Sequence, residues 1–421
     1  MRTALTAALA ALCASAPALA DDVNLAPDLR RRHAVHLGGS RGEVEIHGSL
    51  SHRDPGDRSF CQDAGCPPRD ELTVHWASVV GGRIVGKQAL VAGMDGSPPI
   101  SGVRQIGLAD INADGQGDLL LEYDAGGTRH WRVAPNAGET FRVDPAMHTS
   151  TTTAGVHMVG LADADANGTA DLWVQYDAGG ARHWQLRRSQ SRTQIFNQIS
   201  GFASTTTPGV AAVGVADANG DRRADLWLQY DNGGRRHWQV RLSNGHAADR
   251  SFQTDTTTPN VQAVAVADAN GDRWGDLWLQ FDHAGQRRWQ VRHFRNVPRQ
   301  GLGFGDFHTV GTPHLDARLL GVADFNGDKK ADLFITYGNV VEVYPKTAAG
   351  FGAPIRYESA LPNTQFVQVG DADGDGKADV WLTSKATAPT RNQPRGGEST
   401  ADWGMATRYL LRSDGRRLIK L

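Results

Sequence analysis

Six nine-residue segments of this chain place oxygen-bearing side chains at positions one, three, five and nine. Asp stands at positions one and nine of every segment, and only Asp or Asn stands at positions three and five. A hard cation such as Ca²⁺ takes six to eight oxygen ligands, from carboxylates, carbonyls and water, at about 2.3–2.6 Å. The pattern therefore predicts up to six calcium sites, and we name the segments loops one to six.

The predicted ligands are the side chains at these four positions, with a backbone carbonyl near position seven completing each set. They are Asp110, Asn112, Asp114 and Asp118 in loop one; Asp163, Asp165, Asn167 and Asp171 in loop two; Asp217, Asn219, Asp221 and Asp225 in loop three; Asp268, Asn270, Asp272 and Asp276 in loop four; Asp324, Asn326, Asp328 and Asp332 in loop five; and Asp371, Asp373, Asp375 and Asp379 in loop six. A solvated Asp/Asn/Gly turn is the alternative for a single copy, but six copies in one register favour cation sites.

The EF-hand, another calcium-binding loop, does not fit this sequence. An EF-hand loop has twelve residues, ends in a bidentate Glu and lies between two helices. The twelfth positions here are Leu121, Val174, Leu228, Leu279, Ile335 and Leu382. Position six, where a tight bend favours Gly, holds Arg222, Arg273 and Lys329 in loops three, four and five. We expect these three loops to bind calcium more weakly than the others.

Each loop lies between two runs of residues that are typical of β-strands. In loop three, the apolar run 213–216 precedes the loop and the alternating run 226–230 follows it. A Gly-rich turn at 231–234 then leads to a second alternating run, which is a strong β-hairpin signal. A fourth strand is expected near 193–197 in one unit and near 251–254 in the next. Each unit therefore predicts four antiparallel strands and no helix.

Successive loops start 53, 54, 51, 56 and 47 residues apart, and a repeat near fifty residues with four strands describes one blade of a β-propeller. The predicted fold is an all-β propeller, with seven blades preferred over six or eight. Residues 21–101 form an N-terminal β segment that we expect to be a divergent first blade. Residues 102–421 hold the six blades with loops, and 385–402 read as a polar surface insert.

The loops and their spacing make the chain resemble the FG-GAP/VCBS repeat family, which includes integrin alpha-subunit propellers and many secreted bacterial proteins. The name-giving residues occur as Phe351-Gly352-Ala353-Pro354, with a looser Gly303-Phe304-Gly305. The resemblance covers roughly 102–421 and implies that each loop joins the first and second strands of a blade and binds calcium. It does not settle function, because the fold carries adhesion proteins, lectins, lyases and toxin modules.

The N-terminus predicts export from the cytoplasm. Residues 1–20 have a lone Arg2, an apolar run and Ala18-Leu19-Ala20 before two aspartates, which is typical of a secretory signal peptide. A secreted or periplasmic location follows. After cleavage only Cys61 and Cys66 remain, and a local disulfide is the simplest interpretation, with a free reactive pair as the alternative. No later apolar run reaches the length of about 20 residues that a membrane span needs.

The charge balance suggests a class of partner. The formal net charge is −2, but many of the acidic residues belong to the loops, so a calcium-loaded protein would be positively charged. An anionic polysaccharide or another protein is therefore the expected partner. The alternative is that scattered Arg residues only solvate an outer rim. No nucleic-acid-binding motif is present, so a nucleic-acid partner is not expected.

A repeated Arg–Trp pair offers a second candidate surface. Trp131, Trp184, Trp238 and Trp289 each follow an Arg or a His in the predicted third strand. They could stack on sugars and make a multivalent lectin, or they could pack between blades. No catalytic motif or catalytic residue can be identified. The preferred interpretation is a non-catalytic binding or adhesion protein, and the alternative is a carbohydrate-active enzyme similar to polysaccharide lyases on the same scaffold.

Overall fold

Every regular element that the structure describes is a β-strand. This computed structural model describes residues 33–36, 42–46, 50–51, 71–80, 83–91, 103–114, 118–135, 144, 146–191, 193–297, 301–371, 375–384 and 407–420. The predicted signal peptide, Cys61, Cys66, Asp373 and the insert at 385–402 lie outside these residues. In the described part of the chain, no helix has the length and apolarity needed to cross a bilayer.

The strands form a series of antiparallel sheets in chain order. Six sheets have four strands: β6 (Val103–Ala109), β7 (Asp118–Ala125), β8 (Thr128–Ala134) and β9 (His148–Thr151); β10 (His157–Ala162), β11 (Asp171–Ala178), β12 (Ala181–Arg188) and β13 (Gln198–Thr205); β14 (Ala211–Ala216), β15 (Asp225–Asn232), β16 (Arg235–Ser243) and β17 (Ala248–Thr256); β18 (Gln262–Ala267), β19 (Asp276–His283), β20 (Gln286–Val297) and β21 (Gly301–Thr312); β22 (Arg318–Ala323), β23 (Asp332–Tyr337), β24 (Val340–Tyr344) and β27 (Ile355–Glu358); and β28 (Thr364–Gly370), β29 (Asp379–Ser384), β30 (Thr407–Ser413) and β31 (Leu418–Lys420).

Two smaller groups of strands complete the molecule. A short hairpin of β25 (Lys346–Thr347) and β26 (Gly350–Phe351) joins β24 to β27. The N-terminal sheet contains β1 (His33–His36), β2 (Gly42–Ile46), β3 (Leu50–Ser51), β4 (Glu71–Val80) and β5 (Arg83–Val91). These strands lie within the segment 21–101, whose assignment as a divergent first blade stays a prediction, and β30 with β31 forms a hairpin at the end of the last sheet.

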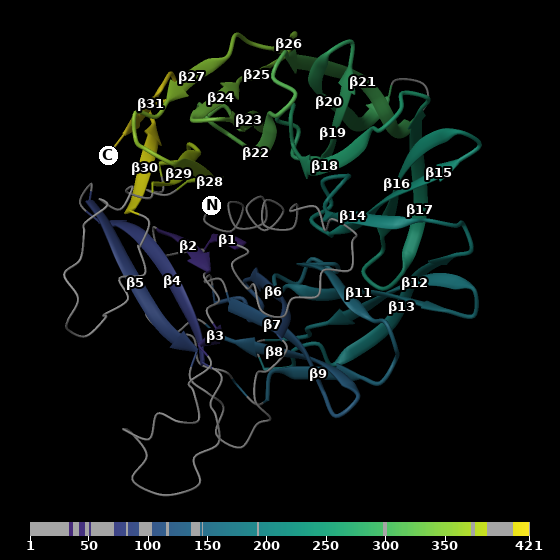
Figure 1. Ribbon diagram of the computed structural model, residues 1–421. Coiled ribbons are helices and arrows are strands. Elements are labelled where there is room, and N and C mark those ends of the chain that lie inside the picture. The colour runs from purple at the N-terminus through teal and green to yellow at the C-terminus, as the bar shows by residue number, and fades with distance from the viewer. Residues whose placement is uncertain are drawn as a thin grey trace, which may run out of the picture.

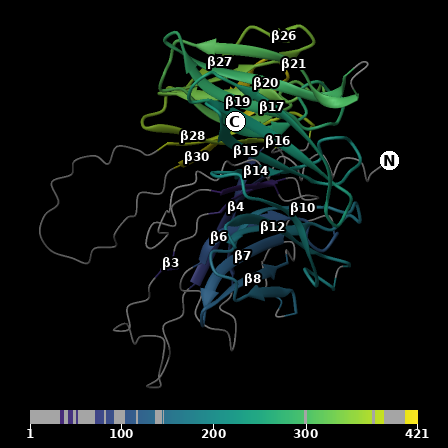
Figure 2. The same ribbon diagram turned by 90° about the vertical axis from the view of Figure 1, so that its right-hand side faces the viewer.

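The sheets follow one another around a ring, with the first strand of each sheet nearest the centre (Figure 1). The first strands contact their neighbours in the order β6, β10, β14, β18, β22 and β28, and β1 contacts both β6 and β28. Figure 2 shows the same ring from its side, with the strands of successive sheets stacked against each other. The all-β fold with four-stranded antiparallel sheets is confirmed, whereas the number of blades stays a prediction.

The position of one fourth strand differs from the sequence-based expectation. The strand expected near 193–197 is β13, which begins only at Gln198, because residues 193–197 form the turn that leads into it. That turn buries Ile195 and Phe196, so an apolar turn resembled a strand. The strand expected near 251–254 lies inside β17.

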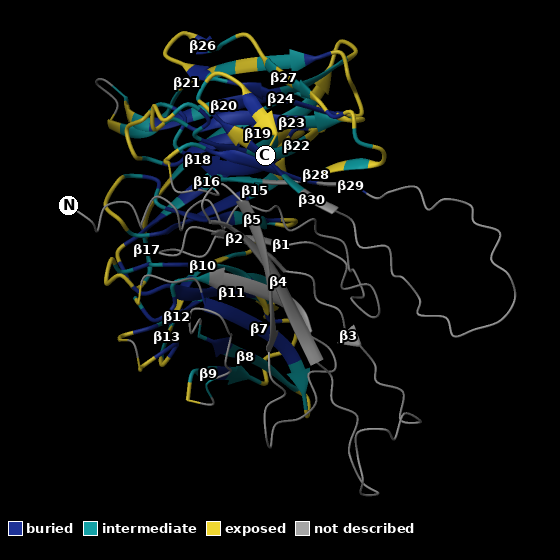
Figure 3. Cartoon of the chain, turned by 90° about the vertical axis from the view of Figure 1, so that its left-hand side faces the viewer, coloured by how far each residue is buried: buried dark blue, intermediate teal, exposed yellow. Residues whose placement is uncertain are grey.

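The core lies between adjacent sheets rather than inside any one of them. One cluster joins Trp173 and Trp184 from β11 and β12 to Val215 and Leu226 from β14 and β15. Figure 3 shows the buried residues concentrated along the inner and middle strands. Burial on both sheet faces explains why the second strands carry continuous apolar runs, as expected for propeller blades.

The repeated tryptophans of the third strands belong to this core. Trp131, Trp184, Trp238 and Trp289 are at most 1% exposed, so they cannot stack on a sugar. An arginine from the next sheet covers three of them. The guanidinium carbon of Arg187 lies 4.9 Å from the ring centroid of Trp131. The corresponding distances are 5.6 Å from Arg241 to Trp184 and 5.3 Å from Arg292 to Trp238. The packing interpretation of the Arg–Trp repeat is therefore correct.

A second set of arginines forms hydrogen bonds from one sheet to the next. Arg182 donates to both carboxylate oxygens of Asp177 at 2.8 Å and also to the carbonyl oxygen of Val210, just before β14. Arg236 and Arg287 repeat this arrangement with Asp231 and Asp282. These arginines are engaged by the fold, which favours a structural role for part of the basic surface.

Candidate metal centres

All six loops join the first strand of a sheet to its second strand. Loop two, for example, connects β10 to β11, and its last residue is the first residue of β11. This is the placement that the resemblance to FG-GAP/VCBS repeats implies. Loops one to six therefore lie at the same end of their sheets, between the innermost strands and their neighbours.

The aspartate at position nine is buried in every loop. Asp118, Asp171, Asp225, Asp276, Asp332 and Asp379 are all 0% exposed. In loop two the Asp171 carboxylate accepts hydrogen bonds from the backbone N–H of Ala164, at position two, and of Ser189, at the end of the third strand, both at 2.8 Å. Loops three, four and five repeat both bonds. This residue fixes the loop to its own sheet.

The aspartate at position one folds the loop back on itself. Asp163 Oδ1 accepts the backbone N–H of Ala166 at 2.7 Å, and Asp163 Oδ2 accepts that of Gly168 at 2.8 Å. Loops three to six repeat the bond from position six to the Oδ2 atom. Because the chain turns around this carboxylate, the side chains at positions one, three and nine are brought together.

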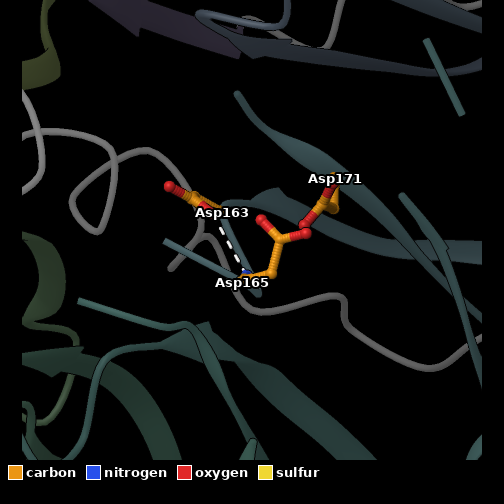
Figure 4. Close-up of side chains that lie close together, drawn as sticks. All are labelled: Asp163, Asp165 and Asp171. Carbon is orange, nitrogen blue, oxygen red and sulfur yellow. Dashed lines mark hydrogen bonds between the residues drawn. The ribbon is translucent and has the colours of Figure 1, made fainter. Parts of the chain in front are cut away.

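Loop two brings three carboxylates within reach of one cation. Asp163, Asp165 and Asp171 each offer an oxygen, and these oxygens lie within 4.8 Å of one another. Two ligands on opposite sides of a calcium ion are about 5 Å apart, so the spacing fits a metal. Figure 4 shows the three side chains and the hydrogen bond from the Asp165 N–H to Asp163. Among the described residues, no other group of three acidic, histidine or cysteine ligands meets this limit.

The electrostatics of loop two also favour a cation. Burial, together with the nearby Asp165 and Asp163 carboxylates, raises the pKa of Asp171 to about 8. Burial likewise raises the pKa of Asp163. The cationic side chain of Arg188 lies 3.4 Å from Asp165 Oδ2. A bound divalent cation would neutralise these carboxylates and lower their pKa values.

In loops four, five and six, other side chains contact the acids. Lys330 pairs with Asp328 at 3.1 Å in loop five, and Lys377 pairs with Asp375 at 3.0 Å in loop six. In loop four, His293 Nδ1 lies 3.0 Å from Asp276 Oδ2. Sequence reasoning missed His293, because no spacing relates it to its loop and only the fold places it there.

Position six has the same backbone conformation with or without Gly. The φ angle is +89° at Gly168 and +85° at Gly376, and it is +70° at Arg222, +72° at Arg273 and +68° at Lys329. The left-handed region costs a residue with a Cβ about 1–2 kcal/mol. Loops three to five therefore close at some cost, and loop two bears a similar cost at position four, where Ala166 has a φ of +63°. Their weaker calcium binding stays a prediction.

Comparison with known proteins agrees with this architecture. A family model described as FG-GAP-like repeat matches residues 324–382, which contain loops five and six. No curated protein matches the chain in sequence. Among solved structures, the chain is similar to a lectin of Agrocybe aegerita, whose description names specific recognition of non-reducing terminal N-acetylglucosamine. The two share 16% identity with a TM-score of 0.51, over 91% of this chain and 96% of the lectin.

Two further structures resemble the chain more distantly. The Dos1 propeller shares 10% identity at a TM-score of 0.39, over 84% of this chain and 76% of its own. The exotype rhamnogalacturonan lyase YesX shares 14% identity at a TM-score of 0.33, over 92% of this chain and 73% of its own. At these identities the likeness to the lectin shows the fold alone. The chain thus has a β-propeller fold with an FG-GAP-like repeat.

The buried aspartates predict an unusual pH dependence. Burial raises the pKa of Asp171 to about 8, of Asp332 to about 7 and of Asp276 to about 6, from 3.8. A folded protein that holds more protons than its unfolded form loses stability as the pH rises through this window. In chelator, the melting temperature should therefore fall between about pH 4 and pH 8. In excess calcium this fall should disappear, because calcium binds the deprotonated carboxylates. Thermal melts that show the same slope in both buffers would contradict the metal sites.

Removing the strain at position six should stabilise loop four. We expect Arg273→Gly to raise the free energy of unfolding in chelator by about 0.5–1 kcal/mol, since the relief of the left-handed conformation exceeds the added entropy of Gly in the unfolded chain. Gly168→Ala, the reverse change in loop two, should lower it. Urea denaturation measures both, and a less stable Arg273→Gly variant would show that the arginine side chain is needed.

Proposed function

We propose that this protein is a calcium-binding β-propeller that acts outside the cytoplasm by binding carbohydrate or protein, without catalysis. The observation that carries the proposal is the shared geometry of the loops. In loops two to five a carboxylate at position one closes the turn and a buried carboxylate at position nine anchors it. A repeated device of this kind is a structural metal site rather than an active centre, which would occur once.

Calcium is the metal that the donor set favours. The candidate ligands are carboxylate and amide oxygens, without the thiolate or imidazole donors that select zinc or copper. In loop two, the oxygens of three candidate carboxylate ligands lie within 4.8 Å of one another. An exported protein also meets calcium at the level that sites of moderate affinity need.

The ring is proposed to have seven blades. The N-terminal sheet supports this number, because β1 contacts both β6 and β28, the first strands of the first and last loop-bearing sheets. A sheet in that place closes the ring and leaves no unpaired gap between the chain ends. The metal loops then belong to six blades, and the seventh, from residues before 102, has none.

Carbohydrate is the ligand class to test first. The lectin that shares this fold is described as recognising N-acetylglucosamine, but at 16% identity its ligand is only a guide. The net charge of −2 becomes positive when several sites hold calcium, which favours acidic polysaccharides over neutral ones. Protein is the second ligand class to test. A ligand of either class would bind to a surface that does not include the buried tryptophans.

The enzyme alternative receives no support from the described residues. A tyrosine–carboxylate cluster on β23 and β24 is the best candidate for acid–base chemistry. The Glu342 carboxylate accepts the hydroxyls of Tyr337 at 2.7 Å and Tyr344 at 2.8 Å. Burial and Glu342 raise the pKa of Tyr337 to about 12 and also raise that of Tyr344. A tyrosine base needs a lowered pKa, so this cluster is better suited to structure.

Calcium binding can be tested at one carboxylate. Asp165→Asn in loop two removes a charge but keeps the shape of the side chain, and Asn stands at position three in four of the other loops. We expect the highest-affinity calcium site to weaken about tenfold, which is about 1.4 kcal/mol, while stability in chelator changes little.

Calorimetric titration of calcium and melting curves in both buffers provide the measurement. The matched control is Asp249→Asn, which removes the same charge from an exposed residue outside every loop. Wild-type protein that binds no calcium and gains no stability from it would refute the proposed metal sites.

Binding and catalysis can be separated by one screen. The protein should be retained on immobilised acidic polysaccharides in calcium and released in chelator, and it should leave no new unsaturated ends after long incubation. The appearance of unsaturated ends at a rate proportional to protein would establish a lyase instead. Heat-treated protein controls for passive adsorption.

A further inference from the structure

The metal loops are bonded to one another as well as to their own sheets. In five consecutive pairs, the backbone carbonyl at position one of a loop accepts the N–H at position eight of the next loop. The bonds are Asp110 to Ala170 at 3.1 Å, Asp163 to Ala224 at 2.7 Å, Asp217 to Gly275 at 2.8 Å, Asp268 to Ala331 at 2.7 Å and Asp324 to Ala378 at 2.7 Å. All six loops thus belong to a single hydrogen-bonded series.

Side-chain packing joins the same neighbours. The residue at position seven of one loop lies over the glycine at position four of the loop before it. A Cβ at Gly220 would lie 2.7 Å from Cδ1 of Trp274, and a Cβ at Gly271 would lie 3.5 Å from Cγ of Lys330. Likewise, a Cβ at Gly327 would lie 3.7 Å from Cγ of Lys377. Gly at position four therefore gives both a left-handed φ and room for the neighbouring loop.

A third contact crosses from the last residue of a third strand to the loop of the preceding sheet. Ser243 Oγ donates to the carbonyl oxygen of Ala164 in loop two at 3.2 Å, and Ser413 Oγ donates to that of Phe325 in loop five at 2.7 Å. The backbone N–H of Ser243 also donates to Asp225, the buried residue of loop three. One serine therefore contacts two successive loops at positions next to candidate ligands.

These contacts place candidate ligands of neighbouring loops on the same short segments of backbone. Asp163 offers its carboxylate to a metal in loop two, while its carbonyl holds the N–H of Ala224, the residue before Asp225 in loop three. A cation that restrains Asp163 also restrains the residue next to a ligand of loop three. A cation that binds loop three afterwards has less backbone left to order, so its binding costs less conformational entropy. Binding at one loop therefore favours binding at the next. The coupling must be reciprocal.

We propose that the calcium loops bind with positive coupling between nearest neighbours, so that loss of one site weakens the loops on either side of it. This inference rests on the proposed calcium binding and concerns how the sites regulate each other. Loop two, with its three converging carboxylates, is the site from which occupancy extends to loops one and three.

Trp274 allows the coupling to be measured at one place. Trp274 stands at position seven of loop four and its indole packs on Gly220 of loop three, so it can sensitise the luminescence of terbium, a luminescent substitute for calcium in oxygen sites, in either of these two loops. The difference in terbium signal between wild type and Trp274→Lys isolates this indole's contribution, and Lys is the residue at position seven of loops five and six. Titration of terbium into the full chain gives the affinity near Trp274.

The test compares a near and a distant loop. Asp163→Asn in loop two should weaken terbium binding at the Trp274-reported site by about fivefold or more. Asp371→Asn makes the same substitution in loop six, which contacts loop five but neither loop three nor loop four among the bonds above, and should not shift that affinity. Circular dichroism confirms that each variant is folded, and Asp165→Ala is a second loop-two variant that leaves the bond to Ala224 in place.

Each outcome decides a different claim. Weaker binding with both loop-two variants but not with Asp371→Asn supports nearest-neighbour coupling. Unchanged affinity in all variants overturns the coupling and leaves the calcium sites intact as independent ones. Equal weakening by the near and distant variants also overturns it, because the effect would then be global. No terbium or calcium binding by wild-type protein overturns both the coupling and the proposed function.

Discussion

The rest of this fold depends on the hydrogen bonds of the buried aspartate carboxylate at position nine of each loop. This carboxylate is fully removed from water, and a charge in that position is costly unless hydrogen bonds, a proton or a cation compensate it. In loop two, Asp171 accepts two backbone N–H groups, one from the loop and one from the end of the third strand. The same residue thus begins the second strand, shapes the turn and creates a demand for positive charge.

The demand is met in two ways, and the two compete. Without metal, a proton can compensate the carboxylate, which is why burial raises the pKa of Asp171 to about 8 and of Asp332 to about 7. Nearby cationic side chains help in part: Arg188 contacts Asp165, and Lys377 contacts Asp375. A divalent cation compensates several carboxylates at once. In loops two, five and six, these cationic side chains therefore offset part of the stabilisation that calcium would contribute.

Most elements of the fold followed from local patterns, except that the apolar turn at 193–197 resembled a strand, and the contacts between the elements did not. Alternation around the turn at 231–234 predicted β15 and β16 correctly, and Asp at positions one and nine predicted where each second strand begins. The loop series was not predictable, because the bond from Ala224 to Asp163 depends on how two sheets stack. Likewise, Arg–Trp repeats are equally compatible with sugar binding and with packing until burial is known, and the 0–1% exposure of these tryptophans decides for packing.

The topology separates the metal loops from the hairpins of the same sheets. The loops connect first strands to second strands, whereas the turns at 126–127, 179–180 and 233–234 connect second strands to third strands at the opposite end. Arg182 and its counterparts bond the sheets together near that opposite end. A ligand bound there would not touch a metal, so calcium would act on it only by holding the sheets in register. The affinity for such a ligand would then depend on the stability of the ring rather than on the charge of any one loop.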